Sequence, residues 1–151
     1  MRDRPGVWSR ADLAAIELRL APMRRADVCA TLRPVRLRCL IVDDNEPFLD
    51  SARRLLESDD LHVVGTATTA AQAIQLADER RPDIALVDVE LREEDGFDVA
   101  RQLVTARPEL RVIMISTHSE DDLANLVAQS PALGFLAKSR LTPAAVRALV
   151  V

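Results

Sequence analysis

The chain has 151 residues, 48% hydrophobic and 29% charged, which fits one domain with a buried core of its own. Its apolar runs are shorter than the roughly 20 residues of a membrane-spanning helix, and no apolar signal region follows the N-terminal arginines. With two cysteines it also lacks a disulfide framework, so we expect a cytoplasmic protein without membrane segments.

The net charge of −4 is unevenly distributed along the chain. Residues 1–38 hold nine arginines against four acidic residues, whereas residues 39–151 hold eleven basic against twenty acidic residues. The acidic body predicts no direct binding of nucleic acid. Residues 1–36 are predicted to be an N-terminal extension, poorly ordered or with one short helix over residues 9–20, and residues 37–151 to form the domain.

Five short apolar runs have the composition of buried parallel strands. They cover residues 37–42, 61–67, 83–89, 110–115 and 134–137.

Segments with apolar residues at helical spacing lie between these runs. They cover residues 48–56, 70–77, 97–104 and 123–127, and a last, short helix begins at Thr142-Pro143. Thr69 and Ser119 are predicted helix N-caps. The alternation predicts an α/β fold with a doubly wound parallel sheet, whose ligands bind at the carboxyl ends of the strands.

Chemically active residue types follow four of the five strands: Asp43 and Asp44, Asp88, Ser116, and Lys138, the only lysine in the chain. Crowded carboxylates repel one another unless a cation intervenes, and Mg²⁺ prefers such oxygen ligands. A carboxylate beside that ion could attack a phosphoryl group while the lysine pairs with a phosphoryl oxygen. Taken singly, the aspartates after the first strand also fit helix capping, and a lone lysine fits an exposed surface position.

Four segments together resemble the receiver domains of two-component response regulators. They are LIVDDNE at residues 40–46, DIALVDVELREEDG at 83–96, VIMIST at 112–117 and GFLAKS at 134–139. In the third and fourth segments the matching residues are Ser116, Phe135 and Lys138. The resemblance covers residues 37 to about 150 and implies a five-stranded sheet in the flavodoxin-like order 2-1-3-4-5, within three α/β/α layers.

The resemblance implies that Asp88 accepts a phosphoryl group from a phosphohistidine on a sensor histidine kinase, with Ser116 and Lys138 assisting. It implies a Mg²⁺ ion bound by Asp43, Asp44, Asp88 and the backbone carbonyl of Glu90, with Asp43 acting mainly through a metal-bound water.

For the signalling step, the resemblance assigns the switch to Ser116 and Phe135 and the tuning of phosphoryl lifetime to Glu90 and His118. The fourth helix, fifth strand and fifth helix would form the output surface and a possible homodimer contact. We therefore expect a stand-alone receiver rather than an enzyme, with an output made by protein contact.

Two departures from the family pattern keep alternatives open. Arg92 stands four residues after Asp88, where proline is common, and the last helix is short. The chain could be the receiver fragment of a longer DNA-binding regulator, or a degenerate receiver that works without phosphorylation. A Mg²⁺-dependent phosphohydrolase is a weaker alternative, because those enzymes carry an Asp-x-Asp nucleophile motif and Glu90 occupies the second position here.

Overall fold

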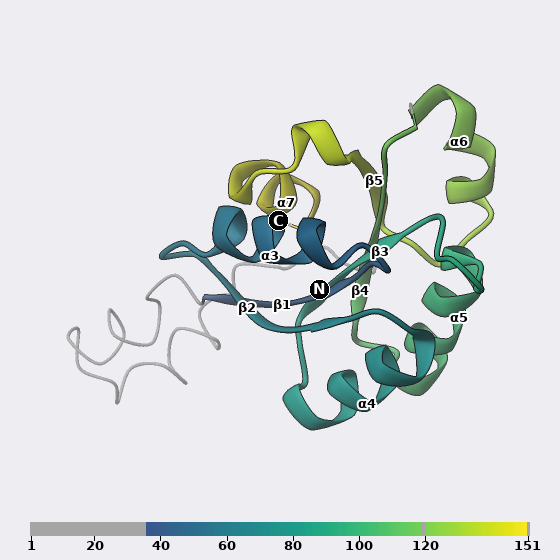
Figure 1. Cartoon of the computed structure of the whole chain (residues 1–151). Coiled ribbons are helices and arrows are strands. Elements are labelled where there is room, and N and C mark those ends of the chain that lie inside the picture. Colours follow the sequence, from purple (N-terminus) through teal and green to yellow (C-terminus); the bar gives the residue numbers. More distant parts are fainter. Residues whose placement is uncertain (1–35, 119, 151) are drawn as a thin grey trace, which may run out of the picture. The chain divides into compact units, whose positions relative to one another are not determined.

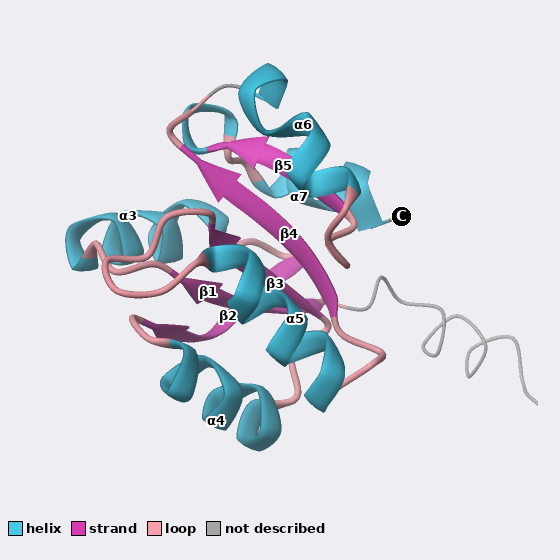
Figure 2. Cartoon of the chain, turned by 90° about the vertical axis from the view of Figure 1, so that its right-hand side faces the viewer, coloured by secondary structure: helices cyan, strands magenta, loops and turns pink. Residues whose placement is uncertain are grey.

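The computed structural model describes residues 36–118 and 120–150. The predicted helix over residues 9–20 and the predicted cap at Ser119 lie outside these ranges. Five parallel strands form one sheet in the order β2-β1-β3-β4-β5, which confirms the predicted architecture (Figures 1 and 2). The strands are β1 (Leu37–Val42), β2 (Leu61–Ala67), β3 (Ile84–Asp88), β4 (Arg111–Ser116) and β5 (Gly134–Ala137).

Three of the strands have the predicted bounds, and the other two differ by one residue at each end. The strand β3 is shorter than the apolar run at residues 83–89. It ends before Val89, whose carbonyl accepts a hydrogen bond from the Gly96 N–H (2.9 Å) as the chain turns into the next helix. The strand β4 extends one residue further than predicted and includes Ser116.

Helices alternate with the strands along the chain. They are α3 (Glu46–Leu56), α4 (Ala70–Arg80), α5 (Gly96–Ala106), α6 (Glu120–Ala128) and α7 (Pro143–Val150), with a 3₁₀ turn η1 (Lys138–Arg140) after β5. Thr69 caps α4 as predicted, by accepting a hydrogen bond from the Gln72 N–H. The cap of α3 is Asn45, which accepts from the Phe48 N–H. The reading of the preceding aspartates as helix caps is therefore wrong.

The helices cover both faces of the sheet and bury two apolar clusters (Figures 1 and 2). On one face, α3 and α7 pack through Leu49, Leu56 and Val146. On the other, α4 and α5 pack through residues such as Ala73 and Leu103. None of the helices among the described residues is long and apolar enough to cross a membrane.

The helix α6 differs from the other helices because none of its side chains at residues 121–128 is fully buried. It packs on the second face through Leu123 and Val127, both only partly buried, and Leu126 is 50% exposed. Few buried contacts make α6 the easiest of these helices to displace.

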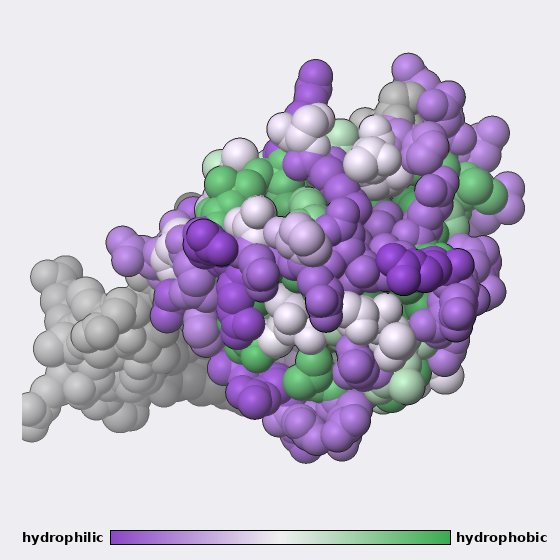
Figure 3. Space-filling model, in the orientation of Figure 1, coloured by the Kyte–Doolittle hydropathy of each residue, from purple (hydrophilic) through white to green (hydrophobic). Residues whose placement is uncertain are grey.

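The face of the molecule drawn in Figure 3 is largely hydrophilic, with apolar atoms gathered over α7.

Candidate functional site

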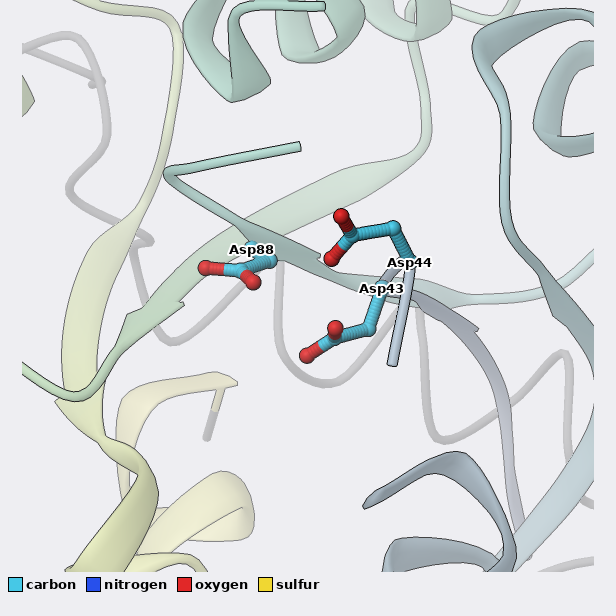
Figure 4. Close-up of side chains that lie close together, drawn as sticks. All are labelled: Asp43, Asp44 and Asp88. Atoms are coloured by element: carbon cyan, nitrogen blue, oxygen red, sulfur yellow. The ribbon is translucent and has the colours of Figure 1, made fainter. Parts of the chain in front are cut away.

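Three carboxylates meet at the carboxyl edge of the sheet (Figure 4). Asp43 and Asp44 follow β1, and Asp88 is the last residue of β3. Because β1 and β3 are neighbouring parallel strands, their carboxyl ends lie side by side. One oxygen from each of the three side chains lies within 4.8 Å of the others. The structure thus brings together the three carboxylates that the sequence pattern singled out.

Lys138 enters the same cluster from the edge strand of the sheet, directly after β5. Its Nζ lies 2.5 Å from Asp43 Oδ2 and 3.1 Å from Asp88 Oδ2, and only 14% of its side chain is exposed. The ammonium also lies 4.3 Å from the centroid of the Phe48 ring, a cation–π distance. The surface reading of this lysine is therefore wrong, since its ammonium is directed into the site.

Burial and charge shift the proton affinities of the two central groups. Burial of Asp43, which is fully enclosed, raises the pKa of its carboxyl, and the negative charge of Asp88 raises it further. Burial on its own would lower the pKa of Lys138. The hydrogen bonds to Asp43 and Asp88 and their negative charges outweigh this effect, so the pKa of Lys138 is raised. Lys138 thus remains charged and offsets part of the carboxylate repulsion.

A second polar group lies beside the cluster. Ser116 is buried at the end of β4, and its Oγ accepts a hydrogen bond from the His118 N–H (3.0 Å). The same Oγ lies 3.2 Å from His118 Nδ1, which in turn lies 3.7 Å from Glu90 Oε1. Glu90 is joined to the cluster through its backbone N–H, which donates to Asp88 Oδ1 (3.2 Å). The residues predicted to tune the site are therefore in contact with one another.

Phe135, the predicted switch residue, lies away from the carboxylates. It is the second residue of β5, pairs in register with Met114 of β4, and belongs to the apolar cluster under α4 and α5. Its side chain is buried in this structure.

Gly96 is required by the close approach of two backbone segments. A Cβ atom at this position would lie 1.9 Å from the carbonyl oxygen of Asp88. Any side chain here would therefore displace the backbone that carries the Asp88 carboxylate. Because glycine has no side chain, the start of α5 can pack directly against the backbone of Asp88.

The donor set fits a small divalent cation. Octahedral Mg²⁺ with bonds of about 2.1 Å has neighbouring ligand oxygens about 3 Å apart and opposite ones about 4 Å apart. The three carboxylate oxygens lie within 4.8 Å of one another, which is close to the larger of these separations. Beside Asp44 the cluster opens into a pocket of about 780 Å³, lined by Asn45, Thr69 and Arg92 among others.

Comparisons with known proteins agree with this geometry. The family model of the response regulator receiver domain matches residues 39–150. The chain belongs to this family. The receiver domain of NarL from Mycobacterium tuberculosis is 32% identical, with a TM-score of 0.67, and the match covers 78% of this chain and 95% of that one.

Two curated relatives are longer proteins, a response regulator and a transcriptional regulatory protein. GacA of Pseudomonas viridiflava is 30% identical over 103 residues, which are 68% of this chain and 48% of GacA. The transcriptional regulatory protein DegU of Brevibacillus brevis is 25% identical over 117 residues, 77% of this chain and 50% of DegU. The chain spans about half the length of these relatives.

Some contacts of the receiver site were missed by sequence reasoning. The ion pair between Arg92 and Asp44 (3.7 Å) and the packing of Lys138 on Phe48 join residues far apart in the chain. Arg92 stands out in the sequence as a departure from the family pattern, but nothing in the sequence indicates its partner. An aromatic residue four positions after Asp44 carries no signal of its own, because it also fits the apolar face of α3.

Proposed function

We propose that this receiver accepts a phosphoryl group on Asp88 from a phosphohistidine of a sensor histidine kinase, in the cytoplasm, and passes the signal on by protein contact. In this proposal residues 37–151 form the receiver and residues 1–36 an extension. The observation that supports it most strongly is the placement of Asp88 beside two further carboxylates and 3.1 Å from the only lysine.

The choice of Asp88 over Asp43 as acceptor rests on access and on the partners of Asp88. Asp43 is fully buried, whereas Asp88 is 6% exposed and lies at the end of its strand. One oxygen of Asp88 is held by Lys138 and the other accepts the Glu90 N–H, so the carboxylate is fixed in orientation. A fixed carboxylate loses little freedom on reaction, which favours attack in line on phosphorus.

In the transfer, an Asp88 oxygen forms the new bond to phosphorus, the N–P bond of the phosphohistidine breaks, and the imidazole leaves with the electron pair. Asp43, Asp44, Asp88 and the Glu90 backbone carbonyl would hold Mg²⁺, with Asp43 acting mainly through water. The bound ion would supply positive charge for the phosphoryl oxygens. Lys138 moves its ammonium from Asp88 to a phosphoryl oxygen, and the Ser116 hydroxyl donates to another.

The proposed output is a shift between two conformations. Ser116 moves toward the phosphoryl group, Phe135 repacks behind it, and the surface of α6, β5 and α7 changes shape. The weak packing of α6 supports this choice of surface, which is also the proposed homodimer contact. Glu90 and His118, in contact beside Ser116, would tune how long the phosphoryl group survives.

The experiment is to incubate the protein with Mg²⁺ and acetyl phosphate and to measure its intact mass. We expect one labile phosphoryl group, which is absent from Asp88→Asn. Asp50→Asn, at an exposed carboxylate of α3, is the matched control and keeps the modification. Absence of any modification would favour a degenerate receiver, and steady turnover of phosphomonoesters would favour a phosphohydrolase.

A second candidate is that the chain is the receiver part of a longer DNA-binding regulator. The lengths of GacA and DegU, about twice the matched segment, and the description of DegU as a transcriptional regulatory protein favour it. The mass of the native polypeptide in its own cells decides between the two. A product close to this chain's 16.7 kDa supports the stand-alone receiver.

A further inference from the structure

Residues 90–95 form a short hairpin between β3 and α5. An antiparallel bridge joins its two ends, and Leu91 and Glu94 exchange backbone hydrogen bonds of 3.2 and 3.3 Å. The Leu91 side chain is buried, and Glu94 Oε1 accepts the Ala70 N–H at the start of α4 (2.9 Å). The hairpin is anchored on both sides of its tip, so the Arg92 side chain extends from a fixed point.

From this tip, Arg92 reaches the carboxylate cluster. Its Nε lies 3.7 Å from Asp44 Oδ2, and the arginine side chain is 81% exposed while that of Asp44 is 26% exposed. Lys138 pairs with Asp43 and Asp88. The two cations therefore divide the three carboxylates between them, and each carboxylate has a positively charged partner.

The two cations differ in what happens when a divalent ion enters. Lys138 is largely buried and contacts the carboxylate that is to be phosphorylated, whereas Arg92 is mostly in water and contacts only the outer carboxylate. A guanidinium cannot ligate a metal, and its charge repels one. Asp44 must exchange the guanidinium for the ion, and a long, exposed ion pair is weak enough to permit that exchange.

We propose that Arg92 is a built-in counter-cation of Asp44, which competes with the divalent ion and so sets how tightly the receiver binds it. This inference rests on the proposed function of the same site. The competition is electrostatic, so it is strongest at low ionic strength and weakens as salt screens the exposed pair.

The test measures Mn²⁺ binding by electron paramagnetic resonance of the free ion, with Mg²⁺ as competitor, on the whole chain. We expect Arg92→Ala to bind Mn²⁺ roughly two- to fivefold more tightly at low salt, and the gain to shrink at high salt. Arg92→Lys, which keeps the charge, should stay near the wild-type affinity.

Arg101→Ala is the matched control, because it removes the same charge from α5, where Arg101 pairs with Asp98 at i,i+3. Equal tightening in Arg92→Ala and Arg101→Ala would overturn the inference, since net charge alone would then explain it. Unchanged affinity in Arg92→Ala, with wild-type protein that binds Mn²⁺ and is phosphorylated on Asp88, would overturn only this inference. Wild-type protein that binds no Mn²⁺ would overturn the proposed function as well.

Discussion

The lysine that follows β5 is the residue on which the electrostatics of the site depend. Lys138 is the only lysine among twenty basic residues, and it holds the fully buried Asp43 and the adjacent Asp88. An arginine would bring a broad, planar group into a space that holds a compact ammonium against the Phe48 ring. The chemistry of the pocket explains why a lysine stands here in a chain that otherwise uses arginine.

Replacing Lys138 with methionine should destabilise the metal-free protein by about 1–2 kcal/mol at neutral pH, since Asp43 loses its partner but can take up a proton. Because folding raises the pKa of Lys138, its contribution to stability is present below the ordinary pKa of 10.5 and is lost as the pH rises through the folded value. Urea unfolding from neutral to alkaline pH measures this. Arg140→Met, at an exposed cation in the same turn, is the control. Parallel pH profiles for wild type and Lys138→Met would contradict the assignment.

At Gly96, the first residue of α5, the site depends on the absence of a side chain. In Gly96→Ala the new Cβ would lie 1.9 Å from the Asp88 carbonyl oxygen, so the backbone must shift. We expect a loss of unfolding free energy of about 2 kcal/mol or more, together with slower phosphorylation by acetyl phosphate. In Gly65→Ala the nearest atom is a Leu76 side-chain carbon at 3.3 Å, which can move, so that variant should remain close to wild type in both measurements. Similar losses in the two variants would contradict the steric explanation.

At the scale of elements, the hairpin 90–95 links the site to the start of α4. Glu94→Ala removes the carboxylate that accepts the Ala70 N–H, leaving an N-terminal backbone donor without this partner. We expect a loss of about 1 kcal/mol and faster amide hydrogen exchange in the first turn of α4. Glu93→Ala, at the exposed neighbouring carboxylate, is the control. Exchange that is equally fast in both variants would contradict a specific role for Glu94.

Local patterns predicted the elements well, and long-range contacts account for what they missed. The strands β1, β2 and β5 have the predicted bounds because polar residues interrupt each apolar run where the strand ends. The position of Lys138 directly after an apolar run also predicted its place in the site, since the carboxyl ends of parallel strands share one edge of the sheet. Asn45, rather than the two aspartates, caps α3, and only the folded backbone distinguishes these three neighbours. The pairing of Arg92 with Asp44 depends on how a six-residue hairpin folds, for which the residue pattern gave no rule.

At the scale of the whole molecule, the functional site lowers the stability of the folded protein when no metal is bound. The sheet brings three carboxylates together, and burial with the charge of Asp88 holds the pKa of Asp43 above its ordinary 3.8. A carboxyl whose pKa is raised by folding stabilises the protein below that ordinary value. Its contribution is lost as the pH rises through the folded pKa. Part of the stability is thus given up to keep an acceptor for a divalent ion.

Asp43→Asn should therefore be more stable than wild type in the absence of divalent ions, with a difference that grows as the pH rises from about 3.8. Saturating Mg²⁺ should remove or reverse this difference. An ion at about a hundred times its dissociation constant stabilises the wild type by about 2.7 kcal/mol, and the variant has lost one ligand. Thermal unfolding at several pH values, with EDTA or with Mg²⁺, measures both effects, and Asp50→Asn controls for the change in net charge. A variant that is less stable than wild type at every pH in EDTA would show that the pairing of Asp43 with Lys138 outweighs the burial and repulsion of its carboxylate.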